Sequence, residues 1–229
     1  MLINRRNAMM AGGLSAKSYV QDGLVAMWDG IENAGWGVHD PNATVWQDLS
    51  GNNHNLELKN GAHFDVNSLI TANRNSVSAL LNYRLPWATI EVCAFYDASR
   101  NSSSMVCFGN STDDARILVC APVEIQTYNR NYFVRFSKAV PAKSTWAGVH
   151  DGTSHVGYVN GKVPDGQVLD NSWGTRNGNF GLSGTSNYSN YNFVGNYYCV
   201  RLHSRALTAA EVAANYAVDK ARFNLPDAT

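Results

Sequence analysis

The chain has 229 residues, enough for one large β domain or at most two small ones. Its 18 Lys and Arg balance 18 Asp and Glu, which argues against a nucleic-acid binder and against binding to an anionic membrane surface. No apolar run approaches the roughly 18 residues of a membrane span, so we expect no membrane insertion. Charged residues are only 16%, while 26 Asn and 19 Gly favour turns, so many short strands are expected.

Residues 1–18 differ from the rest because they lack the alternation of a strand. The short apolar stretch at 8–13 is followed at once by Lys17, which is not typical of a secretory signal. We expect an N-terminal arm, residues 1–18, that docks in a larger assembly, and a single domain over residues 19–229. The arm residues expected to make contacts are Ile3, Arg5, Arg6, Met9 and Met10.

From Tyr19 onward the pattern predicts strands, at residues 23–28, 85–96, 117–123, 132–140 and 193–203. The strand at 85–96 is apolar on both faces, which predicts a central position covered on both sides. Its two faces are Ile90, Val92 and Ala94 on one side and Trp87, Cys93 and Phe95 on the other. In the last strand, Tyr198, Val200 and Leu202 are expected to alternate with Cys199, Arg201 and His203.

Turn and helix signals complete the pattern. His150 to Thr153 reads as a tight turn, and Asn160-Gly161 predicts a type I′ hairpin, since both residues tolerate positive φ. Thr208 and Glu211 form a capping box for a helix over residues 209–222. Leu207 and Val212 occupy the hydrophobic-staple positions around that cap, and Val212 and Tyr216 are expected to face a sheet.

The order and spacing of several motifs resemble the concanavalin A-like lectin/glucanase superfamily, in its laminin-G-like branch of bacterial and phage type. The motifs lie at residues 24–29, 46–54, 147–153, 157–162, 193–196 and 200–211. The resemblance implies an all-β jelly-roll sandwich of two antiparallel sheets with a short C-terminal α-helix. The superfamily includes glycan-binding modules, protein-binding modules and glycoside hydrolases, so the fold alone does not give the function.

Catalysis on this fold would need a carboxylate pair about 5–5.5 Å apart for a retaining glycosidase. Glu91 is the only acid in the strand at 85–96, and Asp97 lies six residues on, too far along the chain to be its partner. No nucleophile motif is present either. We therefore expect no catalytic residues, and a glycoside hydrolase is the least favoured of the three functions considered.

The sequence requires no cofactor, and calcium is the one metal it leaves open. Asp48, Asn52 and Asn53 lie on one tight loop, and hard oxygen ligands suit Ca²⁺. The alternative is an Asx-type turn in which Asp48 and Asn52 bond their own backbone, and this alternative is favoured. The four cysteines, without a dense framework, read as buried free thiols, although a disulfide stays open.

Ligand binding is expected at aromatic residues in loops, because a sugar stacks on an aromatic face and bonds to neighbouring amides. The alternative is that these rings anchor their loops against the sandwich, and for Trp36 and Trp173 this alternative is favoured. The candidate ligand-binding residues, for a glycan or a protein, are Trp36, Trp173, Asn187, Tyr188, Asn190 and Tyr191.

We expect a non-catalytic, lectin-like binding or structural domain. Residues 3–10 also resemble the start of some phage and prophage structural proteins of gut bacteria. The favoured interpretation is a phage virion component, a head or tail fibre or a decoration, that attaches to a host-surface glycan or to a neighbouring virion protein. Such a protein is expected to be an oligomer or part of a larger assembly. The alternative is a secreted or surface-bound bacterial carbohydrate-binding module.

Overall fold

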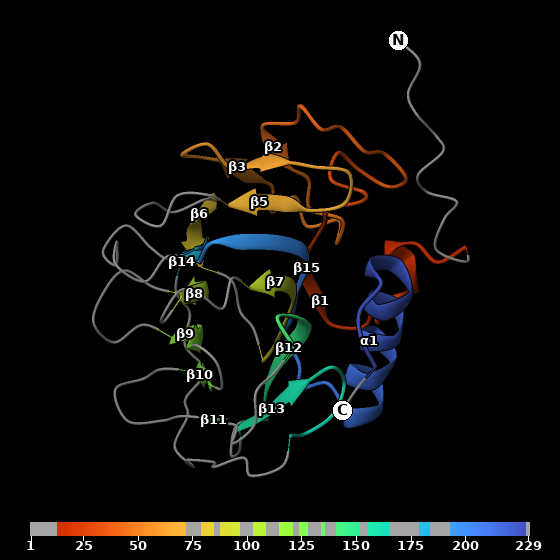
Figure 1. The fold of residues 1–229 in the computed structure, drawn as a ribbon, viewed down its shortest axis with the longest axis vertical. Helices are drawn as coiled ribbons and strands as arrows, with labels where there is room; N and C mark the ends of the chain where they lie inside the picture. The colour runs from red at the N-terminus through yellow and green to blue at the C-terminus, as the bar shows by residue number, and fades with distance from the viewer. Residues whose placement is uncertain are drawn as a thin grey trace.

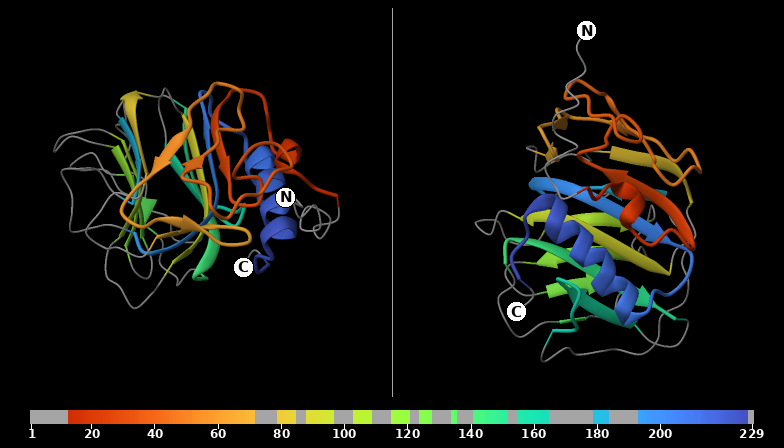
Figure 2. Two further views of the ribbon diagram at one scale, coloured as in Figure 1. Left: turned by 90° about the horizontal axis from the view of Figure 1, so that it is seen from above. Right: turned by 90° about the vertical axis from the view of Figure 1, so that its right-hand side faces the viewer.

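A computed structural model describes residues 13–71, 79–84, 88–96, 103–108, 115–120, 124–127, 134–135, 141–151, 155–164, 179–183 and 193–227. Within these residues, two antiparallel sheets lie face to face, and α1 (Ala209–Phe223) lies on the outer side of one of them (Figures 1 and 2). This arrangement confirms the predicted all-β jelly roll with a C-terminal helix.

The first sheet, which α1 covers, has seven strands among the described residues. In spatial order they are β13 (His155–Val159), β12 (Lys143–His150), β7 (Thr89–Tyr96), β15 (Gly195–His203), β5 (Leu69–Thr71) and β4 (His63–Phe64), with β1 (Leu24–Asp29) also paired to β15. The second sheet has eight described strands. They are β11 (Val134–Arg135), β10 (Glu124–Thr127), β9 (Ala115–Cys120), β8 (Ser103–Phe108), β14 (Asn179–Leu182), β6 (Ala79–Arg84), β3 (Leu56–Leu58) and β2 (Val45–Trp46).

The apolar pattern placed the central strand correctly. β7 lies between β12 and β15, and its inner face, Ile90, Val92 and Ala94, joins the core between the sheets. In β15 the expected alternation is wrong at one residue. A β-bulge between Tyr197 and Cys199 shifts the register, so Tyr197 enters the core and Tyr198 turns to the α1 side beside Cys199.

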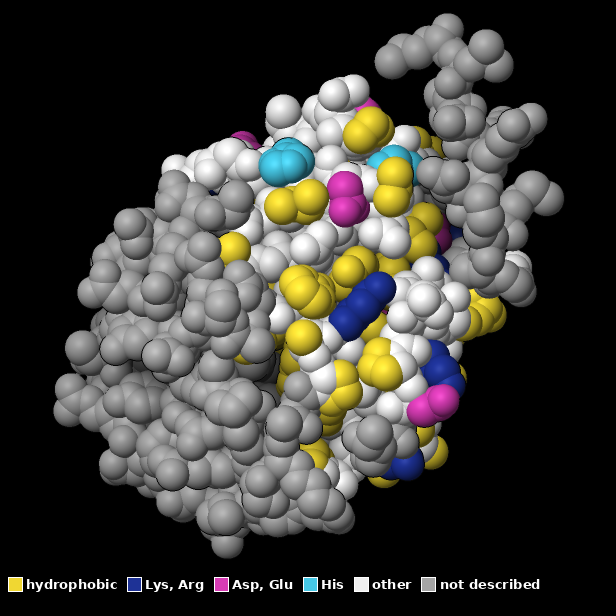
Figure 3. All heavy atoms as spheres, in the orientation of Figure 1, with side chains coloured by type: hydrophobic (Ala, Val, Ile, Leu, Met, Phe, Trp, Pro, Cys, Tyr) yellow, Lys and Arg dark blue, Asp and Glu magenta, His cyan; other side chains and the backbone are white. Residues whose placement is uncertain are grey.

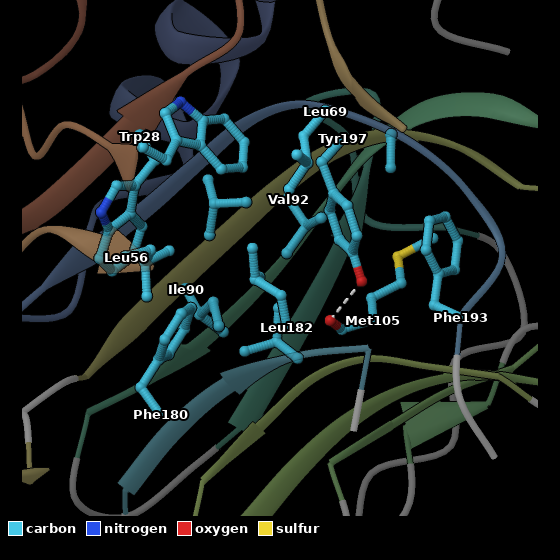
Figure 4. Packing of buried hydrophobic residues seen from close by; sticks show 14 of the residues in the cluster. Trp28, Leu56, Leu69, Ile90, Val92, Met105, Phe180, Leu182, Phe193 and Tyr197 are labelled. Carbon is cyan, nitrogen blue, oxygen red and sulfur yellow. Dashed lines mark hydrogen bonds between the residues drawn. The ribbon is translucent and has the colours of Figure 1, made fainter. Parts of the chain in front are cut away.

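The space between the sheets is filled by aromatic and aliphatic side chains from both layers (Figure 4). Trp28 of β1 stacks on Phe180 of β14, with ring centroids 4.8 Å apart. The Tyr197 hydroxyl donates to the Met105 carbonyl oxygen at 2.6 Å across this space. Burial of apolar surface at roughly 25 cal/mol per Å² makes this layer a main source of stability.

The helix begins where the sequence predicts. Thr208 Oγ1 accepts from the Glu211 N–H, and a Glu211 carboxylate oxygen accepts from the Thr208 N–H, as a capping box requires. Leu207 and Val212 are buried in one cluster. The Asn160-Gly161 turn is also confirmed, with φ of 50° and 76°. A Cβ on Gly161 would lie 3.1 Å from Ala213 Cα, so this turn needs glycine to pass under α1.

A layer of buried charge lies between α1 and the first sheet. Arg201 of β15 donates Nη1 and Nη2 to the Asp219 carboxylate at 2.7 Å each, and Nε to Glu91 Oε2 at 2.9 Å. Arg222 bonds to Asp29 and Glu32 in the same way. Burial raises the pKa of Asp29, and the Arg222 guanidinium opposes that rise. All six side chains are buried.

The two cysteines whose side chains are described, Cys93 and Cys199, are free and buried in this layer, as the sequence indicates. They are register partners on β7 and β15. Burial raises the pKa of both thiols well above the usual value, so both stay protonated and act as small apolar groups.

Candidate functional site

The loop between β1 and β2 presents Trp36 to solvent. The indole is 40% exposed, and Val38 beside it is exposed as well. Two backbone hydrogen bonds close the loop around the ring, from the Ala34 N–H to the Val38 oxygen and from the Val38 N–H to the Gly35 oxygen. Gly37 has φ of 69°, a conformation that a side chain would strain. The loop therefore holds one defined shape.

The Asn33 side chain at the base of the loop fixes it further. Asn33 Nδ2 donates to the Asp40 carbonyl oxygen, and the Asp40 N–H donates to Asn33 Oδ1, both at 2.8 Å. This two-bond clamp joins the two ends of the loop. Asn33 is fully buried, so the amide is shielded from competing water.

Glu32 connects the loop to two other parts of the domain. Glu32 Oε2 accepts from the Gly37 N–H at 2.9 Å, and Oε1 accepts from the Ala16 N–H at 2.7 Å and from Arg222 Nη2 at 2.9 Å. One buried carboxylate thus holds the loop, the 3-10 helix η2 (Ala16–Ser18) and α1 together. Figure 2 shows η2 beside α1.

The same contacts bear on the expected arm. Ala16 and Tyr19 are buried against the domain, and Tyr19 donates its hydroxyl to Asp219 Oδ1 at 2.8 Å. Ala16 of the predicted arm therefore packs on the domain, and the docking of the arm in a larger assembly stays a prediction. The predicted contact residues of the arm, Ile3, Arg5, Arg6, Met9 and Met10, lie outside the described residues.

Lys17 supplies a cation to this site. Its ammonium nitrogen lies 5.2 Å from the centroid of the Trp36 ring, within the range of a cation–π contact. An exposed indole with an ammonium beside it can stack on the C–H face of a sugar and donate to its hydroxyls or carboxylate. The sequence analysis selected Trp36 but missed Lys17, which only the fold brings to the ring, and Glu32, whose role shows only in its bonds to Gly37, Ala16 and Arg222.

The loop predicted as a calcium site is held by hydrogen bonds. Asp48 Oδ1 accepts from the N–H groups of Met27 and Ser50, and Oδ2 accepts from Ser50 Oγ and the His54 N–H, at 2.8–2.9 Å. A carboxylate has about four lone-pair positions, and all are used. Asn52 donates its amide to the Val25 oxygen. Asp48 as placed does not fit a calcium ion, and calcium stays an untested prediction.

Asn53, the third residue of the predicted calcium site, also serves a turn, and most of the predicted ligand-binding residues are not described. Asn53 has φ of 61°, and its Oδ1 accepts from Asn55 Nδ2 at 3.0 Å, which is again a turn contact. The remaining candidates lie outside the described residues, namely Trp173, Asn187, Tyr188, Asn190 and Tyr191.

Glu91, the one acid of the predicted central strand, is fully buried under α1. Its Oε2 accepts from Arg201 Nε and from Asn215 Nδ2 at 2.7 Å. A saccharide cannot reach this carboxylate as placed. Among the described residues, no group of three or more His, Cys, Asp or Glu side chains is gathered where it could hold a metal ion. Likewise, no helix in the described part of the chain has the length and apolarity to cross a membrane.

Two solved structures illustrate the proteins whose fold is similar to that of this chain. A search of curated proteins finds no match. Among solved structures, the chain is similar to Trypanosoma rangeli sialidase in complex with sialic acid, at 16% identity and a TM-score of 0.56, covering 86% of this chain and 33% of that one. It is also similar to a mutant of HCR/D, at 12% identity and a TM-score of 0.59, covering 86% of this chain and 52% of that one. The chain thus spans a third of the sialidase and half of the HCR/D chain, and these likenesses show the fold alone.

A family profile shows to which superfamily the chain belongs. The profile of the concanavalin A-like lectin/glucanase superfamily, of laminin-G type, matches residues 51–213, which is more than half of the chain. The match runs from the loop after β2 into α1 and includes all the described strands of both sheets except β1 and β2. The chain belongs to the concanavalin A-like lectin/glucanase superfamily.

Proposed function

We propose that this chain is a non-catalytic saccharide-binding domain and that the loop carrying Trp36 is its binding site. The observation that carries the proposal is an exposed indole on a loop held by Asn33, Glu32 and two backbone bonds. A ring fixed before binding loses little conformational freedom when a ligand stacks on it, which favours affinity. A ring that only anchored its loop would be buried.

Lys17 points to the class of sugar. Its ammonium lies beside the Trp36 ring, and an ammonium pairs with a carboxylate. The Trypanosoma rangeli sialidase of similar fold binds sialic acid, a carboxylated sugar. Sialylated glycans are therefore the first probes, next to their neutral counterparts.

The test is binding to a glycan array by the full chain and by Trp36→Ala. We expect Trp36→Ala to weaken binding about tenfold or more, since it removes the stacking surface, while the melting temperature changes little. Val38→Ala, an exposed residue of the same loop, is the matched control and keeps its affinity. Unchanged binding by Trp36→Ala would refute this site. Running the array with and without calcium tests the calcium prediction as well.

We propose further that the domain works within a phage particle, attaching it to a host-surface glycan or to a neighbouring virion protein. The support is the resemblance of residues 3–10 and the fixed anchor of Ala16 on Glu32, from which an arm could extend. Density-gradient sedimentation of a lysate should place the protein with intact particles. Deletion of residues 1–12 keeps the buried Ala16 and should release a folded domain from the particle, whereas continued assembly of that variant would refute the arm.

A further inference from the structure

The Trp36 site has two halves that come from different segments of the chain. Trp36 lies in the loop between β1 and β2, and Lys17 lies in η2. The contact between them, 5.2 Å from the ammonium nitrogen to the ring centroid, is a cation–π contact at an exposed position, which is a weak interaction. The relative position of the two halves therefore depends on other contacts.

Each half keeps its own shape through local hydrogen bonds. In η2, Ser15 Oγ accepts from the Lys17 N–H at 3.2 Å, and Ser18 Oγ accepts from the Ser15 N–H at 3.3 Å. In the loop, the Asn33 clamp and the two backbone bonds within residues 34–38 hold the turn. None of these bonds joins one half of the site to the other.

Glu32 supplies the connection between the halves. Its Oε2 accepts at 2.9 Å from the N–H of Gly37, the residue after Trp36. Its Oε1 accepts at 2.7 Å from the N–H of Ala16, the residue before Lys17. Hydrogen bonds to an ionised group are roughly twice as strong as those between neutral groups. Because both oxygens belong to one rigid carboxylate, the two bonds fix the backbone at Trp36 relative to the backbone at Lys17.

The surroundings of the carboxylate support this role. Glu32 is buried, so water competes little for its oxygens. Arg222 Nη2 of α1 donates to Oε1 at 2.9 Å and supplies the counter-charge. A glutamine at position 32 could not keep both backbone bonds, since its amide nitrogen would face one of the two N–H donors. The connection therefore needs a carboxylate.

A cation at a fixed place is a distinctive feature on this protein. Only 16% of the residues are charged, and Lys and Arg side chains are few on the described part of the face in Figure 3. A ring and an ammonium at a set spacing can recognise a carboxylated sugar, because the ring takes the C–H face and the ammonium takes the carboxylate. The ring alone would bind neutral and carboxylated sugars alike.

On the basis of the saccharide binding proposed for the Trp36 loop, we propose that Glu32 is a positioning residue with two effects. It makes the site selective for carboxylated sugars, and it couples sugar binding to the docking of residues 15–18. When these residues are docked, Lys17 stands at the ring and the site is complete. When they detach, the ring stays on its loop and the ammonium leaves. By reciprocity, a sugar that contacts both halves stabilises the docked segment.

Isothermal titration calorimetry of the full chain with sialyllactose and with lactose tests the selectivity. We expect the natural chain to bind sialyllactose about fivefold more tightly than lactose, as an exposed ion pair gives. Lys17→Gln, which removes the ammonium directly, should bring this ratio of affinities close to one. Glu32→Gln should do the same while its lactose affinity changes less than about twofold. A merely structural role of Glu32 would lower both affinities together.

Two further variants separate positioning from stability. Ala16→Pro removes only the N–H that Glu32 Oε1 accepts, at the first position of a helix, where proline is tolerated. Ser15 before it is extended, with φ of −122° and ψ of 176°, as a residue before proline requires. This variant should lose the selectivity as Glu32→Gln does. Leu182→Ala, which opens a cavity between the sheets away from the site, should keep the ratio of the natural chain.

Amide hydrogen exchange tests the coupling directly. We expect the N–H groups of Ala16 and Gly37 to exchange at least about tenfold faster in Glu32→Gln than in the natural chain. Sialyllactose should slow exchange at Ala16, and lactose should not. Unchanged exchange in Glu32→Gln, or an unchanged affinity ratio in Glu32→Gln and Ala16→Pro, would overturn the role of Glu32 and leave the Trp36 site standing. Binding of neither sugar by the natural chain would instead overturn the proposed function, and the role of Glu32 with it.

Discussion

The two faces of the first sheet are buried by different chemistry. Toward the second sheet, the sheet presents aromatic and aliphatic side chains, such as Trp28 stacked on Phe180. Toward α1, it presents Arg201, with Glu91 beside it on the next strand and Asp219 above it on the helix. The same strands therefore contribute to an apolar layer on one side of the sheet and to an ionic layer on the other.

The two layers are stabilised by different kinds of contact. Contacts in the apolar layer have no strict direction, so the layer tolerates small shifts at the cost of packing. The ionic layer depends on fixed partners, because a buried charge without its partner is costly. Arg201 also stacks over the Tyr19 ring at 4.1 Å, and Tyr19 in turn bonds to Asp219. The network thus fixes the position of α1 and of residues 16–19 on the sheet.

The largest effect should come from breaking the ionic layer. Arg201→Met leaves Glu91 and Asp219 buried without their cation, and we expect it to lower the free energy of unfolding by about 4 kcal/mol. Urea unfolding at pH 7 measures the loss. Arg205→Met is the matched control, since Arg205 pairs with Glu211 and Asp22 at the partly exposed surface and should cost less than about 1 kcal/mol. Equal losses would contradict the distinction.

A cavity in the apolar layer should lower the free energy of unfolding somewhat less. Leu182→Ala removes a fully buried side chain between the sheets, with an expected loss of about 3 kcal/mol. No charge is involved, so unfolding measured at pH 5 and pH 7 should give the same loss. A strong pH dependence of the loss for Leu182→Ala would contradict the view that this layer is stabilised by apolar packing alone.

The sequence predicted the apolar layer far better than the ionic one. Ile90, Val92 and Ala94 alternate in β7, and this period alone identifies the inner face. In α1, Val212 and Tyr216 were correctly expected to face the sheet, but Asn215, Asp219 and Arg222 are buried too. Polar residues on a helix normally indicate a solvated face, and only their partners on other elements show otherwise.

The candidate site was predictable only in part for the same reason. The sequence made Trp36 in its Gly-rich loop a candidate, although anchoring of the loop was the favoured alternative, and its exposure is seen only in the structure. Lys17 reaches the ring from a distant segment, and the contacts of Glu32 with Ala16 and Arg222 likewise join distant segments, which no local pattern records. Strand register is also hard to predict, because a bulge such as the one at Tyr197 changes which side chains face the core.

The smallest effect should come from the one part of the α1 layer that faces solvent. The Arg205 guanidinium and the Thr208 N–H lower the pKa of Glu211 to about 2. Because this folded-state pKa lies below the ordinary value of 4.5, the stabilisation is complete above about pH 4.5 and is lost as the pH falls toward 2.

Glu211→Gln keeps an acceptor for the cap but loses the ion pair with Arg205, so we expect it to cost about 0.5–1 kcal/mol at pH 7. At pH 3 the difference between Glu211→Gln and the natural chain should shrink, because Glu211 of the unfolded chain takes up a proton below its ordinary pKa of 4.5, whereas the folded chain keeps it ionised. Thermal unfolding at both pH values measures it. A difference that is equal at both values would mean that Glu211 acts through its shape in the cap alone, and then charge at this surface would add nothing to the anchoring of α1.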